Sequence, residues 1–131
     1  MLVHDTAEVE RGIETFALEP NGGLVLPPDV FFSTHRDLII GLAAKHRLPA
    51  IYSARDYVTS GGLICYGTDR HVLYRQAAGY IDRLLKGEKL ANLPVQAPTK
   101  WDLVLNLKTA KALGLQVPAT LLVRADEVIE E

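Results

Sequence analysis

Apolar and polar positions follow two different periods along the chain. Apolar residues that recur every three or four positions predict amphipathic helices, and short apolar runs or strict alternation predict strands. The expected helices cover residues 6–17, 34–46, 70–86, 107–113 and 118–129. The expected strands cover residues 24–26, 50–52, 63–66 and 101–105. Glycine and proline punctuate most of the boundaries between these elements.

Strands and helices alternate almost throughout this order. That alternation predicts an α/β fold with a mostly parallel sheet, helices on both faces and right-handed crossovers. A length of 131 residues is typical of one domain, so residues 1–131 are expected to form a single three-layer unit. A sheet of this kind binds ligands in the crevice at the carboxyl ends of its strands.

The stretch 49–69 is the best candidate for such a binding edge. It contains two apolar runs, and each ends in a tyrosine followed by a small residue: Tyr52 with Ser53, and Tyr66 with Gly67. Read as strand ends, these residues would bring aromatic side chains and flexible backbone to one edge of the sheet. An equally good interpretation is that both tyrosines cap the hydrophobic core.

Two aspartates follow predicted strands and are expected at the same edge. Asp29 comes after the strand at 24–26, and Asp69 comes after the strand at 63–66. A carboxylate in this position suits a small flavodoxin-like enzyme or an interaction domain, which is the alternative to a binding module. The simpler interpretation, favoured for Asp69, is that each carboxylate caps the start of a helix.

Composition and charge exclude several classes of protein. A net charge of −2 gives no electrostatic basis for binding nucleic acid. Cys65 is the single cysteine and lies in an apolar run, so neither a disulfide nor a nucleophile is expected. The four histidines show no zinc-site spacing, and the glycine pairs lack the context of a phosphate loop, so no metal or cofactor is expected. The first residues lack the pattern of a signal peptide, and no apolar run has the length of a membrane helix.

Four segments carry a resemblance to a known family. They read LPAIY at 48–52, GGLICYG at 61–67, AAGYIDRLLKG at 77–87 and PTKWDLVLNLKTAKALGL at 98–115. With the residues between them, they resemble the carboxyl-terminal part of the ABC-transporter substrate-binding proteins of the tryptophan/tyrosine-uptake type. The resemblance covers essentially the whole chain from about Asp5.

The resemblance implies one lobe of a type I periplasmic binding protein. Such proteins close on a small ligand, for example an amino acid, between two α/β lobes and deliver it to a membrane permease without catalysis. It further implies a periplasmic location, a crossing between lobes at LPVQAPT (93–99), and a set of residues on the cleft side of this lobe. That set is Asp29, Tyr52, Ser53, Tyr66 and Gly67.

The chain departs from the family upstream of Asp5. Family members carry a signal or lipid-anchor sequence there, followed by most of a first lobe, so the chain is expected to be cytoplasmic if Met1 is its true start. A cleft needs both walls to desolvate a ligand, so an isolated lobe is expected to bind weakly or not at all. The strand and helix within 101–113 are expected to lose partners, and the exposed surface is expected to be covered in a homodimer.

Overall fold

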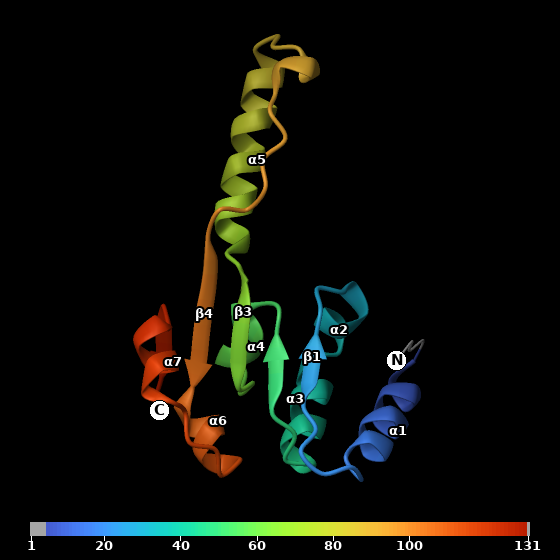
Figure 1. Cartoon of the computed structure of the whole chain (residues 1–131). Helices are drawn as coiled ribbons and strands as arrows, with labels where there is room; N and C mark the ends of the chain where they lie inside the picture. The colour runs from blue at the N-terminus through green and yellow to red at the C-terminus, as the bar shows by residue number, and fades with distance from the viewer. Residues whose placement is uncertain (1–4, 131) are drawn as a thin grey trace.

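The computed structural model describes residues 5–130. Figure 1 shows a sheet flanked by helices, with one long helix standing away from it. The helices are α1 (Thr6–Phe16), α2 (Val30–Thr34), α3 (Arg36–Lys45), α4 (Arg55–Thr59), α5 (Arg70–Leu85), α6 (Leu107–Ala112) and α7 (Ala119–Arg124), with a 3₁₀ turn at Leu90–Asn92. The strands are β1 (Leu24–Leu26), β2 (Ala50–Tyr52), β3 (Ile64–Thr68), β4 (Trp101–Asn106) and β5 (Glu127–Ile129).

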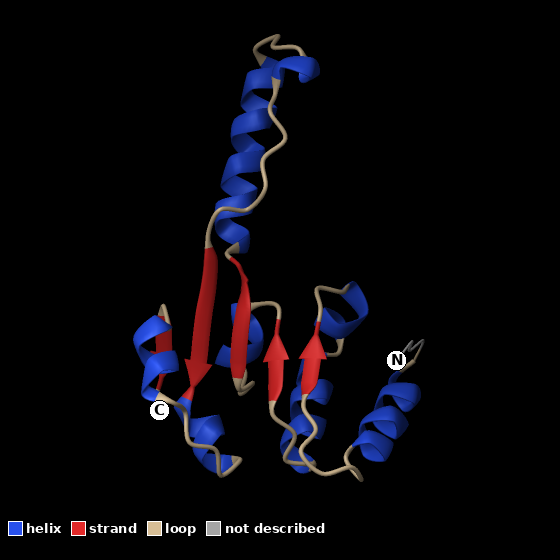
Figure 2. Ribbon diagram, in the orientation of Figure 1, coloured by secondary structure: helices blue, strands red, loops and turns tan. Residues whose placement is uncertain are grey.

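The strands form one mostly parallel sheet in the order β1–β2–β3–β4–β5. β1 and β2, β2 and β3, and β4 and β5 pair in parallel, whereas β3 and β4 pair antiparallel. Figure 2 shows α3 and α4 behind the sheet and α7 in front of β5, so helices lie on both faces. The predicted α/β fold class is therefore confirmed.

The core lies between the sheet and α1, α3 and α4. Asp5 accepts a hydrogen bond from the Glu8 amide and so starts α1, whose Val9 and Ile13 are one turn apart and both buried. They join a cluster with Leu26 and Tyr52, which are register partners on neighbouring strands. Alternate residues of the strands therefore supply one apolar face to the helices.

The helix expected at 34–46 is two helices in the structure. Asp29 caps α2, which begins at Val30, and α3 begins at Arg36. Ser33 and Thr34 lie within α2, and their hydroxyls donate to the backbone carbonyl groups of Asp29 and Val30, four residues earlier. The predicted start at residue 34 was therefore wrong, because Ser33 and Thr34 have the helical backbone of α2 and the next helix begins only after His35.

The helix expected at 118–129 is also wrong in its second half. α7 ends at Arg124, and Glu127–Ile129 form β5 at the edge of the sheet. The Leu103 amide donates to the Asp126 carboxylate at 2.8 Å, and the Asp126 amide donates to the Leu103 carbonyl at 2.9 Å. These two bonds align residues 127–129 beside β4. The apolar residues near the end of the chain also fit a helical spacing, so the sequence did not reveal this pairing with β4.

Residues 70–100 form a projection that we call the arm, built from α5, the 3₁₀ turn and an extended return at 93–100 (Figure 1). None of the residues Arg70–Leu85, all of which the structure describes, is buried. The Tyr80 hydroxyl donates to the Pro94 carbonyl, and Arg83 donates two hydrogen bonds to the Glu88 carboxylate. Among the described residues, no helix combines the length and the apolarity needed to span a membrane.

The expectation that 101–113 would lose its partners is wrong. β4 lies between β3 and β5, and its Val104 and Leu105 are buried. The amphipathic stripe expected on the longest helix does exist, but it lies on the arm and not on the core. Exposed apolar side chains lie on the arm and at the β1 edge, where Val25 is 78% exposed, and also on α2 and α7, where Val30 and Val123 are 83% and 87% exposed.

Candidate functional site

A cavity of about 670 Å³ lies at the carboxyl ends of β1, β2 and β3, and we call it the strand-end hollow. Its walls come from the start of α2, the residues just after β2, the end of β3 and the base of the arm. Its lining residues are Pro28, Asp29, Val30, Ser33, Thr34, Ser53, Ala54, Thr68, Arg70 and Leu73. The position is the one expected for a ligand in an open α/β sheet.

A second cavity of about 530 Å³ lies beside it, between α4 and the start of α5. Ala54, Thr68 and Arg70 line both cavities, so they form the partition between them. The Arg70 guanidinium donates to the Asp56 carboxylate, which holds the side chain across this partition. One basic group is therefore within reach of both cavities.

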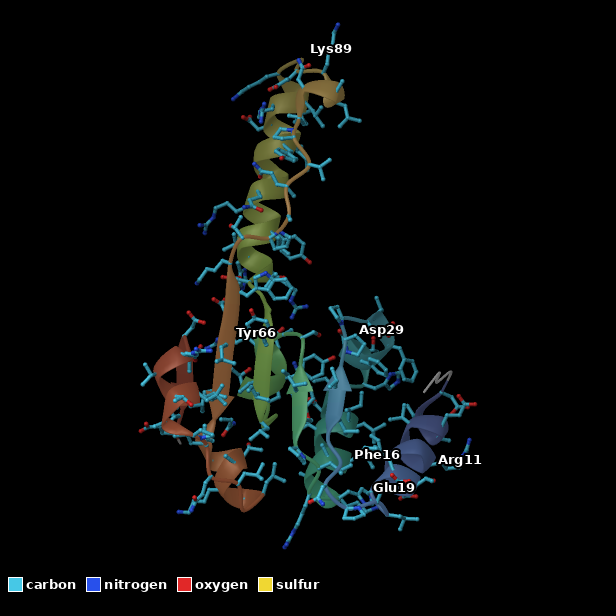
Figure 3. The ribbon with its side chains drawn as sticks, viewed as in Figure 1. Arg11, Phe16, Glu19, Asp29, Tyr66 and Lys89 are labelled. Carbon is cyan, nitrogen blue, oxygen red and sulfur yellow. The ribbon has the colours of Figure 1, made fainter. Side chains whose placement is uncertain are left out.

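Asp29 lies at the end of β1, on the edge that Figure 3 shows below the arm. Its Oδ1 accepts hydrogen bonds from the amides of Phe31 at 2.7 Å and Phe32 at 3.4 Å. Asp69 acts in the same way at the start of α5, where Oδ1 accepts from the His71 amide at 2.8 Å. Both aspartates are thus helix caps, as the simpler interpretation predicted.

The two tyrosines of the predicted edge have different environments. Tyr52 is 2% exposed and stacks on Tyr57 with ring centroids 4.9 Å apart, and burial raises its pKa to about 12. Tyr66 is 53% exposed and stacks on Trp101 at 5.5 Å, on the opposite face of the sheet. The structure therefore places Tyr52 in the core beneath the site and Tyr66 outside both cavities.

Ser53 and Gly67 lie in closer contact than the sequence indicated. A Cβ atom on Gly67 would lie 2.0 Å from the Ser53 carbonyl oxygen, well inside the sum of the atomic radii. The ends of β2 and β3 approach each other this closely because position 67 has no side chain. Ser53 lines the strand-end hollow and Gly67 lines the neighbouring cavity, so this close contact connects the linings of the two cavities.

The structure adds Thr68 and Arg70 to the predicted site residues. In the sequence, Arg70 is one of several charged residues in the helix predicted at 70–86. The sequence did contain a signal for placing Arg70 at the site. Arg70 directly follows Asp69 and is the first residue of a helix that comes after a strand. The first turn of such a helix lies at the ligand edge of the sheet.

Cys65 lines the second cavity but is itself buried, at 2% exposure. Burial and the nearby charges of Asp102 and Asp56 raise the pKa of its thiol to about 11. The thiolate is the reactive form, so we expect no modification by a disulfide reagent such as DTNB at pH 8, and full modification in denaturant. Rapid labelling of the native chain, followed by absorbance, would contradict this burial.

The fold and the strand-end hollow define a structural class of protein. It is an α/β lobe with a cavity at the carboxyl ends of its strands and an arm that projects beside that cavity. Comparison with protein families gives the family directly. The family model of the ABC transporter substrate binding proteins matches residues 1–129, and the chain belongs to that family.

Individual relatives agree with this assignment. A "Tyrosine-binding protein" of Clostridioides difficile is 28% identical over an alignment 130 residues long, which covers 87% of this chain and 37% of the relative. A solved ABC domain in complex with L-Trp from Streptococcus pneumoniae has a TM-score of 0.85 and 27% identity, over 97% of this chain and 44% of the other. A conserved domain protein from Vibrio cholerae has a TM-score of 0.83 and 27% identity, over 93% and 41%. The chain thus spans less than half the length of these relatives.

Proposed function

We propose that this chain is a solute-binding component of an ABC transporter and that its ligand is an amino acid with an aromatic side chain. The observation that carries the proposal is the strand-end hollow in a chain that belongs to the substrate-binding family. The names of two relatives, one tyrosine-binding and one solved with L-Trp, support the choice of ligand class. We infer that residues 1–131 correspond to one lobe together with its crossing segment.

The charges of the hollow suit an amino acid. Such a ligand carries an ammonium and a carboxylate, and it needs an acceptor for the first and a donor for the second. The Oδ1 atom of Asp29 accepts the hydrogen bonds that cap α2. The Oδ2 atom would then accept hydrogen bonds from the ammonium group of the ligand. Arg70 supplies the cationic donor, in exchange for its hydrogen bond to Asp56. The remaining site residues, Ser53 and Thr68, add hydroxyl groups.

The first test is a thermal-shift titration with L-tryptophan and L-tyrosine at millimolar concentration. Because a ligand that binds the folded state stabilises it, we expect the Tm of the chain to rise by a few degrees. Asp29→Asn should lose most of this rise, since asparagine caps a helix as well as aspartate but cannot neutralise an ammonium. Indole-3-propionate, which has the ring and carboxylate without the ammonium, should shift both proteins equally.

Asp37→Asn is the matched control for this test. Asp37 is an exposed carboxylate on α3, outside both cavities, so its variant should keep the full shift with L-tryptophan. Equal shifts in Asp29→Asn and in the unchanged chain would remove Asp29 from the site. No shift with any amino acid would contradict ligand binding by this lobe.

The family role extends to partners. We infer that an ABC permease receives the ligand, that the protein acts on the periplasmic side of the membrane, and that two copies associate. Family membership supports the first two inferences. The exposed apolar side chains of the arm support the third, because soluble chains seldom leave a continuous apolar face in water.

A further inference from the structure

Arg70 is the basic residue at which the two cavities meet. It is the first residue of α5, which leaves the sheet at the end of β3 (Figure 1). Its side chain lines both the strand-end hollow and the second cavity. The Arg70 guanidinium donates to Oδ2 of Asp56, which lies in the first turn of α4 and lines the second cavity but not the hollow. The partner of Arg70 therefore lies on the opposite side of the partition from the proposed ligand.

The contact between Arg70 and Asp56 uses a small part of what a guanidinium offers. A guanidinium has five N–H donors, and this contact joins Nη2 to one carboxylate oxygen. Arg55 and Glu127 form a two-point pair instead, with Nε and Nη2 on separate carboxylate oxygens at 2.7 and 2.6 Å. Among the residues that the structure describes, Asp56 is the only partner of the Arg70 side chain. The other donors of Arg70 are therefore available to a second carboxylate.

A change of partner at Arg70 costs little free energy. The Arg70 and Asp56 side chains are 50% and 56% exposed, so water solvates both charges when the contact breaks. Exposed ion pairs of this kind contribute little to stability. The His71 amide donates to the Asp69 carboxylate, so the start of α5 keeps its cap when the Arg70 side chain moves. The side chain can therefore change partner while the base of the arm stays folded.

We propose that Asp56 is an internal competitor for Arg70 and thereby sets how strongly the strand-end hollow selects ligands that carry a carboxylate. Without a ligand, the Asp56 carboxylate holds the guanidinium. A ligand carboxylate in the hollow displaces Asp56 and takes the two-point geometry that Asp56 leaves unused. Breaking the pair lowers the affinity for carboxylates and for no other ligand. Asp56 itself does not touch the ligand, so it is a positioning residue.

This inference deepens the proposed function and rests on amino-acid binding in the hollow. NMR titrations with two ligands test it. L-tryptophan carries a carboxylate, and tryptamine has the same ring and ammonium group without one. Asp56→Asn removes the competing charge, so the Kd for L-tryptophan should fall about two- to fivefold, the range that an exposed ion pair accounts for. The Kd for tryptamine should stay the same, because this ligand does not use Arg70.

Asp37→Asn is the matched control. Asp37 pairs with Arg36 through one contact at 2.9 Å and lies outside both cavities. The substitution removes an equal charge and an equivalent pair, so both Kd values should stay unchanged. Arg70→Gln should lose the preference for L-tryptophan over tryptamine. Adding Asp56→Asn to Arg70→Gln should change neither Kd further, because the competitor acts only through Arg70.

Two results would overturn the inference and leave the proposed function standing. If the chain binds L-tryptophan and Asp56→Asn does not lower the Kd, Asp56 does not compete for Arg70. If Asp56→Asn lowers the Kd equally in the Arg70→Gln background, Asp56 repels the ligand carboxylate through its charge alone. Failure of every variant to bind L-tryptophan would instead overturn the proposed function, and this inference with it.

Discussion

Gly67→Ala should be the most destabilising single-atom change in the sheet. The added Cβ would lie 2.0 Å from the Ser53 carbonyl oxygen, which belongs to the backbone and cannot rotate away. Relief requires the ends of β2 and β3 to separate, which costs about 3–5 kcal/mol when it disrupts packing and strand pairing. We expect the midpoint of thermal unfolding to fall by about 10 °C or more.

Gly41→Ala is the matched control for the alanine at position 67. Gly41 lies within α3, and a Cβ there meets nothing within 4 Å. Alanine favours a helix over glycine by about 1 kcal/mol, so this variant should be slightly more stable than the unchanged chain. Circular dichroism melts of both variants make the comparison. A Gly67→Ala protein as stable as Gly41→Ala would show that β2 and β3 do not approach as closely as described.

Tyr52→Ala should lower the free energy of unfolding nearly as much as Gly67→Ala, because it removes a large buried side chain. Tyr52 is 2% exposed and stacks on Tyr57, and truncating a buried aromatic residue typically costs about 3–5 kcal/mol. Tyr66→Ala is the natural comparison, because Tyr66 is 53% exposed. This substitution should lower the free energy of unfolding by about 1 kcal/mol or less. Urea melts of the two variants give the difference. Similar losses in both would contradict the separation of the tyrosines into core and surface.

The pH dependence of stability offers a second measurement at Tyr52. Burial raises its pKa from 10.0 to about 12, so the folded chain retains a proton that the unfolded chain loses above pH 10. The contribution of this group is complete below pH 10 and is lost as the pH rises toward 12. Tyr52→Phe has no proton to lose, so its stability should fall less steeply between these values.

The parts of the fold that depend on local pattern were predictable. Asp69, followed by an apolar stripe and Gly87, predicted the start and end of α5 within one residue. Leu24–Leu26 and Ala50–Tyr52 were predicted as strands because glycine or proline bounds short apolar runs. β5 was missed because its three residues fit a helical period equally well and take their strand geometry from Leu103 and its neighbours on β4.

The position of the candidate site could be predicted from the sequence, but the set of residues that line it could not. The strand ends predicted the edge at which the strand-end hollow lies, and Asp29 and Ser53 line that hollow. Which way a tyrosine points depends on the parity of its position in the strand. Tyr52 is the register partner of Cys65, so Tyr66 is directed to the other face. A continuous apolar run does not reveal which of its residues lie on the same face of the sheet. The register of a strand depends on its pairing with a distant segment of the chain.

The antiparallel pairing of β3 and β4 has a consequence for how the chain folds. Thr68 pairs with Trp101, although 33 positions separate them in the sequence, and the whole arm is inserted between them. Closing a loop of this length costs about 2 kcal/mol more entropy than closing a four-residue turn. In the folded chain, hydrogen bonds from Tyr80 and Arg83 fold the insertion back on itself. The arm thus brings the two ends of the insertion together, so the pairing of β4 with β3 costs less entropy when the arm is already folded.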